Sequence, residues 1–263
     1  MGNAADILDR ILTAKQAEVA ERRRDRPPPS LRERPLYDEP RRGFARALTA
    51  RAGRAIIAEI KRASPSRGVI RADADAKTIA ALYARSGAAA ISVLTDGPFF
   101  GGSLADLEAV RDAVSLPILR KDFILDPYQI EEARAFGADA VLVIVAATEA
   151  RQRRELIAAA AAIDLDAIVE VHDEAELEAA IEAGATIVGI NNRDLRTFRT
   201  TLDVSERLLP LVPSSVLAIC ESGLRTAADI ERLRHRGARA FLVGEALIES
   251  VDPGQRLREL LGG

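Results

Sequence analysis

Glu59 and Lys61 are the residues whose types and spacing first point to chemistry. They stand at the end of an apolar run that begins at Ile56, and a loop containing Ser64 follows. Side chains alternate across a strand, so Glu59 and Lys61 would share one face with Ile57. A carboxylate and an ammonium group at the end of a buried strand are costly unless they pair or bind a ligand. Their position therefore indicates an active site.

Four further apolar runs end in ionisable or amide side chains. These residues are Lys121 after residues 116–120, Glu170 within 167–171, Asn191 after 187–190, and Glu221 after 216–220. Charged groups that lie together perturb one another's pKa values, as general acids and bases require. Any one of them could form a structural ion pair. Together with Glu59 and Lys61, however, they favour a catalytic cluster.

The loops after the last two apolar runs are suited to binding an anion. Gly223 follows the run at 215–220, and Gly244 follows the run at 240–243. Glycine lets backbone N–H groups approach an anion closely, and the start of a helix adds a favourable dipole. These loops predict a phosphate site, with a plain tight turn as the alternative.

Apolar runs that resemble strands alternate eight times with alanine-rich segments of helical periodicity. The runs are 55–61, 89–94, 117–121, 139–145, 166–171, 186–190, 215–220 and 240–243. The helical segments are 75–86, 103–114, 127–136, 148–162, 173–183, 203–209, 225–236 and 254–262. Eight such units predict an α/β fold, a single (β/α)8 TIM barrel, in which the strand ends meet at one rim. An open doubly wound sheet is the competing fold, but no Gly-x-Gly-x-x-Gly follows the first run.

The chain begins with a segment that lies outside this alternation. Residues 4–24 have the apolar stripe of an amphipathic helix, and Pro27, Pro28 and Pro29 end it. We expect residues 27–54 to be a connector. The predicted organisation is an N-terminal helical extension and connector over 1–54, followed by the barrel over 55–263.

Composition excludes several classes of function. The 263 residues carry a net charge of -3 and one cysteine, Cys220, with two histidines. This charge argues against a nucleic-acid surface, and no apolar run has the roughly 20 residues of a membrane span. Intrachain disulfides and thiolate or histidine metal centres are not expected. The chain is predicted to be a cytoplasmic protein without a cofactor or metal.

The residues from Ile57 to Ser66, Ile-Ala-Glu-Ile-Lys-Arg-Ala-Ser-Pro-Ser, resemble the first-strand signature of the indole-3-glycerol-phosphate synthase family. Further matching motifs follow in the family's order over essentially the whole chain. They are Ser-Val-Leu-Thr-Asp at 92–96, Phe-Phe-Gly-Gly-Ser at 99–103, Leu-Arg-Lys-Asp-Phe at 119–123, Val-Glu-Val-His at 169–172, Gly-Ile-Asn-Asn-Arg-Asp-Leu at 189–195 and Glu-Ser-Gly at 221–223.

The resemblance implies ring closure, decarboxylation and dehydration of 1-(o-carboxyphenylamino)-1-deoxyribulose 5-phosphate in tryptophan biosynthesis. Lys121 would be the general acid of ring closure, and Lys61 would hold the substrate carboxylate or donate a proton in dehydration. Glu170 would accept a proton or stabilise positive charge on the amine, and Glu59 would orient Lys61 or assist dehydration. Asn191 and Glu221 would hydrogen-bond the substrate.

The resemblance also implies how the rest of the substrate is held. The phosphate would be held by Ser64, Ser222, Gly223, Gly244 and the backbone of Glu245. Phe100, Phe123 and Leu242 would form an apolar wall beside the aromatic ring, although packing of strands and loops explains them equally well. The partner would be this phosphorylated small molecule, with no nucleic acid or membrane. Because the barrel has no extra domain, a monomer is expected.

Two other functions stay open. A related phosphosugar barrel such as phosphoribosylanthranilate isomerase would be expected to use a Cys and Asp pair, but Cys220 faces away from Glu221 by strand parity. A non-catalytic barrel that binds a phosphorylated ligand would not need two lysines and three glutamates at one rim.

His172, two residues after Glu170, is either a hydrogen-bonding group behind the site or a plain loop residue.

Overall fold

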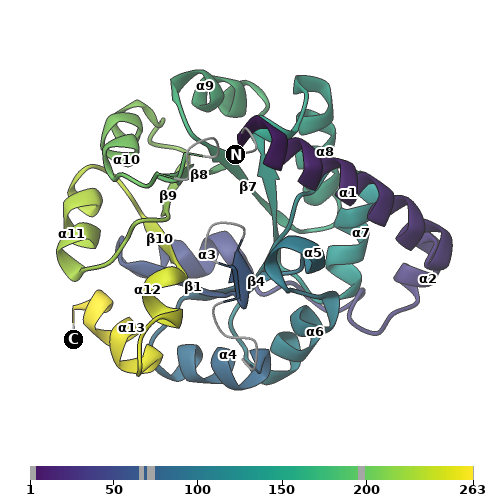
Figure 1. Cartoon of the computed structure of the whole chain (residues 1–263), viewed down its shortest axis with the longest axis horizontal. Coiled ribbons are helices and arrows are strands. Elements are labelled where there is room, and N and C mark those ends of the chain that lie inside the picture. The colour runs from purple at the N-terminus through teal and green to yellow at the C-terminus, as the bar shows by residue number, and fades with distance from the viewer. Residues whose placement is uncertain (1–3, 65–67, 70–74, 195–198, 263) are drawn as a thin grey trace.

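The computed structural model is a closed barrel of eight parallel strands, and it describes residues 4–64, 68–69, 75–194 and 199–262. In the order of their pairing round the barrel, the strands are β1 (Ala55–Ile60), β10 (Ala240–Val243), β9 (Leu217–Glu221), β8 (Ile187–Asn191), β7 (Asp166–Val171), β6 (Ala140–Ile144), β5 (Ile118–Lys121) and β4 (Ala90–Leu94). Figure 1 looks along the barrel and shows the surrounding helices. The predicted (β/α)8 architecture is confirmed.

Helices follow the strands where helical periodicity predicts them. They are α4 (Ala76–Arg85), α6 (Leu104–Ala113), α7 (Pro127–Ala135), α8 (Ala150–Ala162), α9 (Glu174–Glu182), α10 (Asp203–Leu208), α11 (Ala227–His235) and α13 (Pro253–Leu261). Gly137, directly after Phe136, the C-cap residue of α7, has φ 86°, a conformation that glycine adopts at little cost. Among the described residues, every helix lacks either the length or the hydrophobicity of a transmembrane segment.

Strand parity divides the core into two layers. Ile57, Leu119 and Ile168 belong to the cluster inside the barrel, whereas Ile56 and Val169 belong to the layer between strands and helices. Both clusters are buried, so a one-residue change of register would place each strand's polar end in the wrong layer. This alternation is what directs the strand-end side chains into the barrel mouth.

The N-terminal segment contains more structure than a helix and a connector. α1 (Ala4–Asp25) is followed by two short helices, α2 (Pro28–Arg32) and α3 (Phe44–Thr49), within the stretch expected to be a plain connector. Phe44 and Leu48 of α3 are fully buried in the cluster inside the barrel. Helices of five and six residues are too short for periodicity to reveal.

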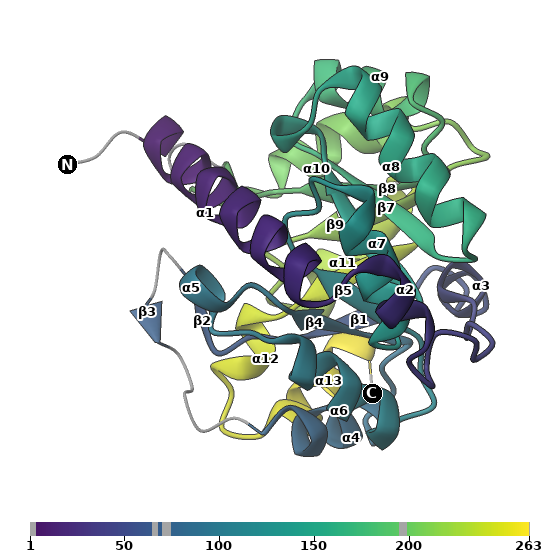
Figure 2. The same ribbon diagram turned by 90° about the vertical axis from the view of Figure 1, so that its right-hand side faces the viewer.

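Three more short elements lie in loops that follow strands. A two-stranded hairpin pairs β2 (Ala63–Ser64) with β3 (Gly68–Val69), α5 (Gly97–Phe100) follows β4, and α12 (Glu245–Ile248) follows β10. Figure 2 shows α1 running past α5 along one side of the barrel. In the remaining connections lie two single 3-10 turns, Val145–Ala147 and Leu209–Leu211.

Candidate active site

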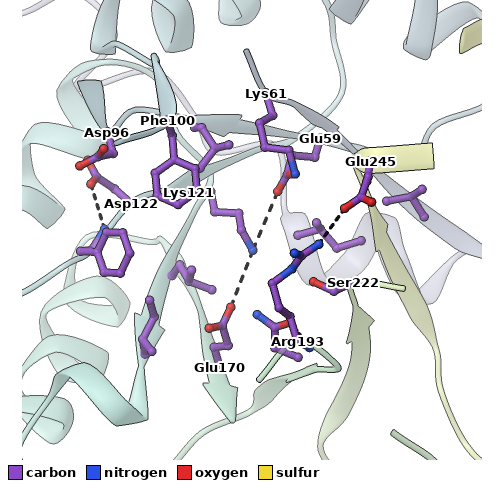
Figure 3. A pocket seen from close by; sticks show the side chains of 18 of the residues that line it. Glu59, Lys61, Asp96, Phe100, Lys121, Asp122, Glu170, Arg193, Ser222 and Glu245 are labelled. Atoms are coloured by element: carbon purple, nitrogen blue, oxygen red, sulfur yellow. Dashed lines mark hydrogen bonds and ion pairs between the residues drawn. The ribbon is translucent and has the colours of Figure 1, made fainter. Parts of the chain in front are cut away.

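Five of the six predicted catalytic residues line one cavity at the C-terminal ends of the strands. They are Glu59, Lys61, Lys121, Glu170 and Asn191. β1, β5, β7 and β8 supply them, with Lys61 directly after its strand. In barrels of this kind the chemistry is located at this rim. Figure 3 shows Glu59, Lys61, Lys121 and Glu170 converging in the cavity.

The Lys121 ammonium group lies among three carboxylates. Its Nζ is 2.6 Å from Oε2 of Glu221, 3.7 Å from Oε2 of Glu170 and 4.0 Å from Oε2 of Glu59. Burial opposes the charged form of Lys121, but the charges of Glu221, Glu170 and Glu59 outweigh it and raise the pKa of Lys121. Lys121 is therefore a protonated group, able to donate a hydrogen bond or a proton at neutral pH.

Glu59 and Lys61 form a second ion pair beside it. Lys61 Nζ lies 3.1 Å from Oε1 of Glu59, whose side chain is almost completely buried. Burial by itself would raise the pKa of Glu59, but the neighbouring Lys61 and Lys121 lower it. Glu59 is thus a carboxylate that holds Lys61 at the edge of the cavity.

Glu221 occupies a different position from the one expected of a substrate-contacting residue. It lies behind Lys121, fully buried, and it is not among the residues lining the cavity. Burial raises the pKa of Glu221 to about 7, in spite of the opposing charge of Lys121. Its Oε1 is buried and has no hydrogen-bond partner in the described residues. Glu221 therefore acts on Lys121 and does not line the cavity itself, and burial makes its carboxyl keep a proton to higher pH than an exposed glutamate.

The raised pKa of Glu221 predicts a pH-dependent contribution to stability. The folded protein binds a proton there between about pH 4.5 and pH 7 that the unfolded chain releases. Stability from this group is therefore present at low pH and is lost as the pH rises through that window. We expect Glu221→Gln to have a smaller fall in Tm than the wild type between about pH 5 and pH 8. Thermal unfolding at the two pH values measures it, and equal falls would contradict it.

Two glycines leave the space that the buried carboxylates fill. A Cβ atom on Gly189 would lie 2.2 Å from Oε1 of Glu221, and one on Gly244 would lie 2.3 Å from Oε1 of Glu59. Both contacts are far inside van der Waals distance. Gly244, expected at the phosphate loop, thus also makes room for Glu59.

The residues predicted to bind phosphate meet at one end of the cavity. Ser222, Gly223, Gly244 and Glu245 line it, while the side chain of Ser64 lies outside the described residues. Ser222 has φ 65°, a left-handed conformation that is uncommon for residues other than glycine and is often found at functional sites.

The carboxylate of Glu245 is held by two arginines. Nη2 of Arg193 lies 2.7 Å from Oε2 of Glu245, and Nη2 of Arg225 lies 3.0 Å from Oε1. Figure 3 shows Arg193 and Glu245 facing each other across this end of the cavity. The two cations offset the negative charge that would otherwise repel an anion here.

The residues predicted to form an apolar wall line the cavity, together with apolar residues that were not predicted. Phe100, Phe123 and Leu242 all line the cavity, and the rings of Phe100 and Phe123 are 6.2 Å apart between centroids. Further apolar lining comes from Ile7, Leu8 and Ile11 of α1. The apolar stripe of the N-terminal helix gave evidence of burial, but it carried no information about which part of the barrel it would cover.

Arg193 is a polar lining residue that was not among the predicted site residues, as are Asp96 and Asp122. It lines the cavity two residues beyond Asn191, and its backbone N–H donates to Oδ1 of Asn191 over 3.0 Å. The signal was available, because an arginine just after a polar strand end is a plausible anion ligand.

Cys220 lies in the outer layer of the core, away from the cavity. It is completely buried, and burial raises the pKa of its thiol to about 12. A protonated thiol is a poor nucleophile, so Cys220 is a packing residue. This position disfavours a mechanism that uses a Cys and Asp pair.

Three known proteins that the chain resembles in sequence share one name. The family model described as "Indole-3-glycerol phosphate synthase" matches residues 8–260. Proteins of that name from Roseiflexus sp. (strain RS-1) and Polaromonas sp. (strain JS666) are 49% and 48% identical, and each alignment covers 98% of this chain and 98% and 99% of the relative. Another, from Dehalococcoides mccartyi (strain CBDB1), is 48% identical, covering 97% of this chain and all of the relative.

Solved structures with low identity share only the fold. The 3-hexulose-6-phosphate synthase of Salmonella typhimurium has a TM-score of 0.64 at 16% identity, over 79% of this chain and 97% of that one. Thiamine phosphate pyrophosphorylase from Pyrococcus furiosus has a TM-score of 0.58 at 14% identity, over 80% of this chain and 94% of the other.

Proposed function

The chain belongs to the indole-3-glycerol phosphate synthase family, and we propose that the cluster around Lys121 carries out that family's reaction. The reaction converts 1-(o-carboxyphenylamino)-1-deoxyribulose 5-phosphate into indole-3-glycerol phosphate, carbon dioxide and water. An aromatic carbon attacks the ketone, carbon dioxide leaves, and loss of the resulting hydroxyl as water completes the indole. The observation that carries the proposal is one protonated lysine held by three carboxylates in a cavity with an apolar wall.

Lys121 is the acid of ring closure in this proposal. As the new carbon–carbon bond forms, negative charge develops on the ketone oxygen, and the Lys121 ammonium group donates a proton to it. Because its pKa is raised, Lys121 stays protonated until negative charge develops on the ketone oxygen. Glu221, 2.6 Å away, fixes the direction of the Lys121 side chain.

Lys61 and Glu59 act in the decarboxylation and dehydration steps. Lys61 stands at the cavity edge, where its ammonium group can bind the substrate carboxylate before it leaves and then donate a proton to the departing hydroxyl. Glu59, 3.1 Å from Lys61, orients it. An ammonium group is a suitable partner for both steps because it combines positive charge with a transferable proton.

Glu170 and Asn191 act on the amine and the sugar. Glu170 stabilises positive charge on the anilino nitrogen and accepts the proton that the CH2 carbon beside this nitrogen loses when water leaves. Oδ1 of Asn191 accepts from the Arg193 backbone, which leaves the amide NH2 to donate to a substrate oxygen. The phosphate binds at Ser222, Gly223, Gly244 and the Glu245 backbone, with Ser64 as a further candidate, and the aromatic ring packs between Phe100, Phe123 and Leu242.

Fluorescence tests this function directly because the chain contains no tryptophan and only three tyrosines. Incubation with the carboxyphenylamino-deoxyribulose phosphate should produce an indole emission that grows with time and enzyme concentration. Carbon dioxide should be released in equal amount. Tight binding of the substrate without any indole signal would instead support a non-catalytic barrel that binds a phosphorylated ligand.

Gly189→Ala should lower kcat by about 100-fold, since its methyl group would push the Glu221 carboxylate away from Lys121. Gly97→Ala is the matched control, because a Cβ there meets its nearest atom, a backbone oxygen, at an ordinary 3.7 Å. Steady-state kinetics compares the two, with circular dichroism to verify folding. A Gly189→Ala enzyme with normal kcat would contradict the proposed part of Glu221.

We also propose that the enzyme is a monomer that works in the cytoplasm. Among the described residues, the exposed large apolar side chains are Leu211 and Val251, far fewer than a stable subunit interface buries. The substrate carries a phosphate and a carboxylate, charges that prevent passage across a membrane. Light scattering after gel filtration measures the mass of the particle in solution, and a value near 28.3 kDa is expected.

A further inference from the structure

His172 lies between two glutamates directly behind the proposed active site. It follows β7, and its Nδ1 is 3.0 Å from Oε2 of Glu176 while its Nε2 is 3.5 Å from Oε1 of Glu170. Only 14% of the imidazole is exposed. The contacts of His172 with Glu176 and Glu170 therefore connect the start of α9 to a carboxylate that lines the cavity.

The two ring nitrogens of His172 differ in their hydrogen-bond partners. Oε2 of Glu176 accepts from the His172 backbone N–H over 2.8 Å and also faces Nδ1, so one end of the ring is anchored. Nε2 is buried and has no hydrogen-bond partner in the described part of the chain. A buried ring nitrogen without a partner is costly, and the acceptor in front of it is Glu170.

Capping of α9 does not explain this arrangement. The helix already has an N-cap in Asp173, whose side chain accepts from the Glu176 backbone N–H over 2.9 Å. The Nδ1 contact orients the ring without using Nε2. Nε2 points from the helix end towards the barrel interior, where Oε2 of Glu170 lies 3.7 Å from Nζ of Lys121.

The charges around His172 favour its protonated form. Burial opposes protonation, but the hydrogen bond to Glu176 and the charges of Glu170, Glu176 and Glu221 outweigh it and raise the pKa of His172. The charges of Glu176 and Arg153 of α8 also interact, with opposite sign. A protonated imidazole donates from both nitrogens, one to each glutamate.

We propose that His172 is a positioning residue that holds Oε1 of Glu170 through Nε2–H, so that Oε2 faces Lys121 and the substrate. This inference rests on the proposed function, because it assigns a partner to the carboxylate that handles the amine. Apo hydrogen bonds at catalytic sites are often long, and the 3.5 Å contact would shorten when substrate orders Glu170. His172 itself transfers no proton to the substrate.

Two substitutions of His172 distinguish the contact made by Nδ1 from the contact made by Nε2. In His172→Asn the amide can occupy the place of Nδ1 and keep the Glu176 contact, but it is too short to reach Glu170. In His172→Gln the longer side chain can place its NH2 near the position of Nε2. We expect kcat to fall about tenfold in His172→Asn with KM little changed, and to recover largely in His172→Gln. Equal losses in both variants, or no loss in His172→Asn, would overturn the proposal.

Nuclear magnetic resonance tests the same contact without using activity. The chain has only two histidines, and the second, His235, is exposed on α11, so His235→Asn assigns the spectrum and serves as the control variant. With imidazole 15N labelling, Glu170→Gln should lower the pKa of His172, which is followed separately from the assigned His235 signals. An unchanged His172 titration would overturn the pairing. Failure of the wild-type enzyme to form indole would instead refute the proposed function, and the titration would still decide whether His172 holds Glu170.

Discussion

Lys121→Ala should abolish turnover while leaving substrate binding largely intact. Without the ammonium group no acid stands at the centre of Glu221, Glu170 and Glu59, and the ketone oxygen must develop its charge unaided. Loss of a general acid of this kind costs roughly 10²–10⁴-fold, and we expect the upper end because the charge of the acid is lost as well. Substrate contacts at the phosphate loops and the apolar wall remain.

Single-turnover fluorescence measures the chemical step of Lys121→Ala, and equilibrium titration with substrate measures binding. Lys77→Ala is the control, since the chain has only four lysines and Lys77 is exposed on α4, away from the cavity. It should retain full activity. Normal turnover in Lys121→Ala would refute its role as the acid. Lost binding with an intact chemical step would assign it to substrate capture.

Lys15→Met should cost about 3 kcal/mol of unfolding free energy, a large loss for one side chain. Lys15 is 1% exposed, and its Nζ lies 3.0 Å from Oδ2 of Asp96, 2.9 Å from Oδ1 of Asp122 and 2.7 Å from Oε2 of Glu18. Methionine fills the space but leaves the buried carboxylates without this cation. Arg120 still pairs with Asp122, which is why the lower part of the usual range applies.

Lys15→Met should also lower the enzyme's activity, because the partners of Lys15 border the active site. Asp122 follows Lys121 directly, and Asp96 caps α5 by accepting from the Phe99 backbone N–H. Chemical denaturation of Lys15→Met against Lys77→Met measures the stability difference, and kinetics measures the loss of activity. If Lys15→Met unfolds at the wild-type denaturant concentration, then α1 is held by its apolar contacts instead of this ion network.

Much of the fold could be predicted from local pattern. Eight strands and their helices alternate in the sequence, and each predicted run contains the observed strand or ends within one residue of it. The side-chain period of two then places Glu59, Lys121, Glu170 and Asn191 on the inner face without any knowledge of the barrel's shape. Short elements such as α3, α5 and α12 escaped because a helix of four to six residues has no period to detect.

Tertiary packing sets the distances between segments that are far apart in the chain. The sequence predicted which side chains face the barrel interior, because that depends on alternation within one strand. It did not determine that Glu221 lies under Lys121, that Glu245 meets Arg193, or that Lys15 of α1 reaches two carboxylates behind the site. These contacts join residues that are 52 to 107 positions apart in the chain, and barrel closure and helix docking bring them together. The order of the strands places chemical groups at a rim, whereas packing in three dimensions selects which groups touch and sets their pKa values.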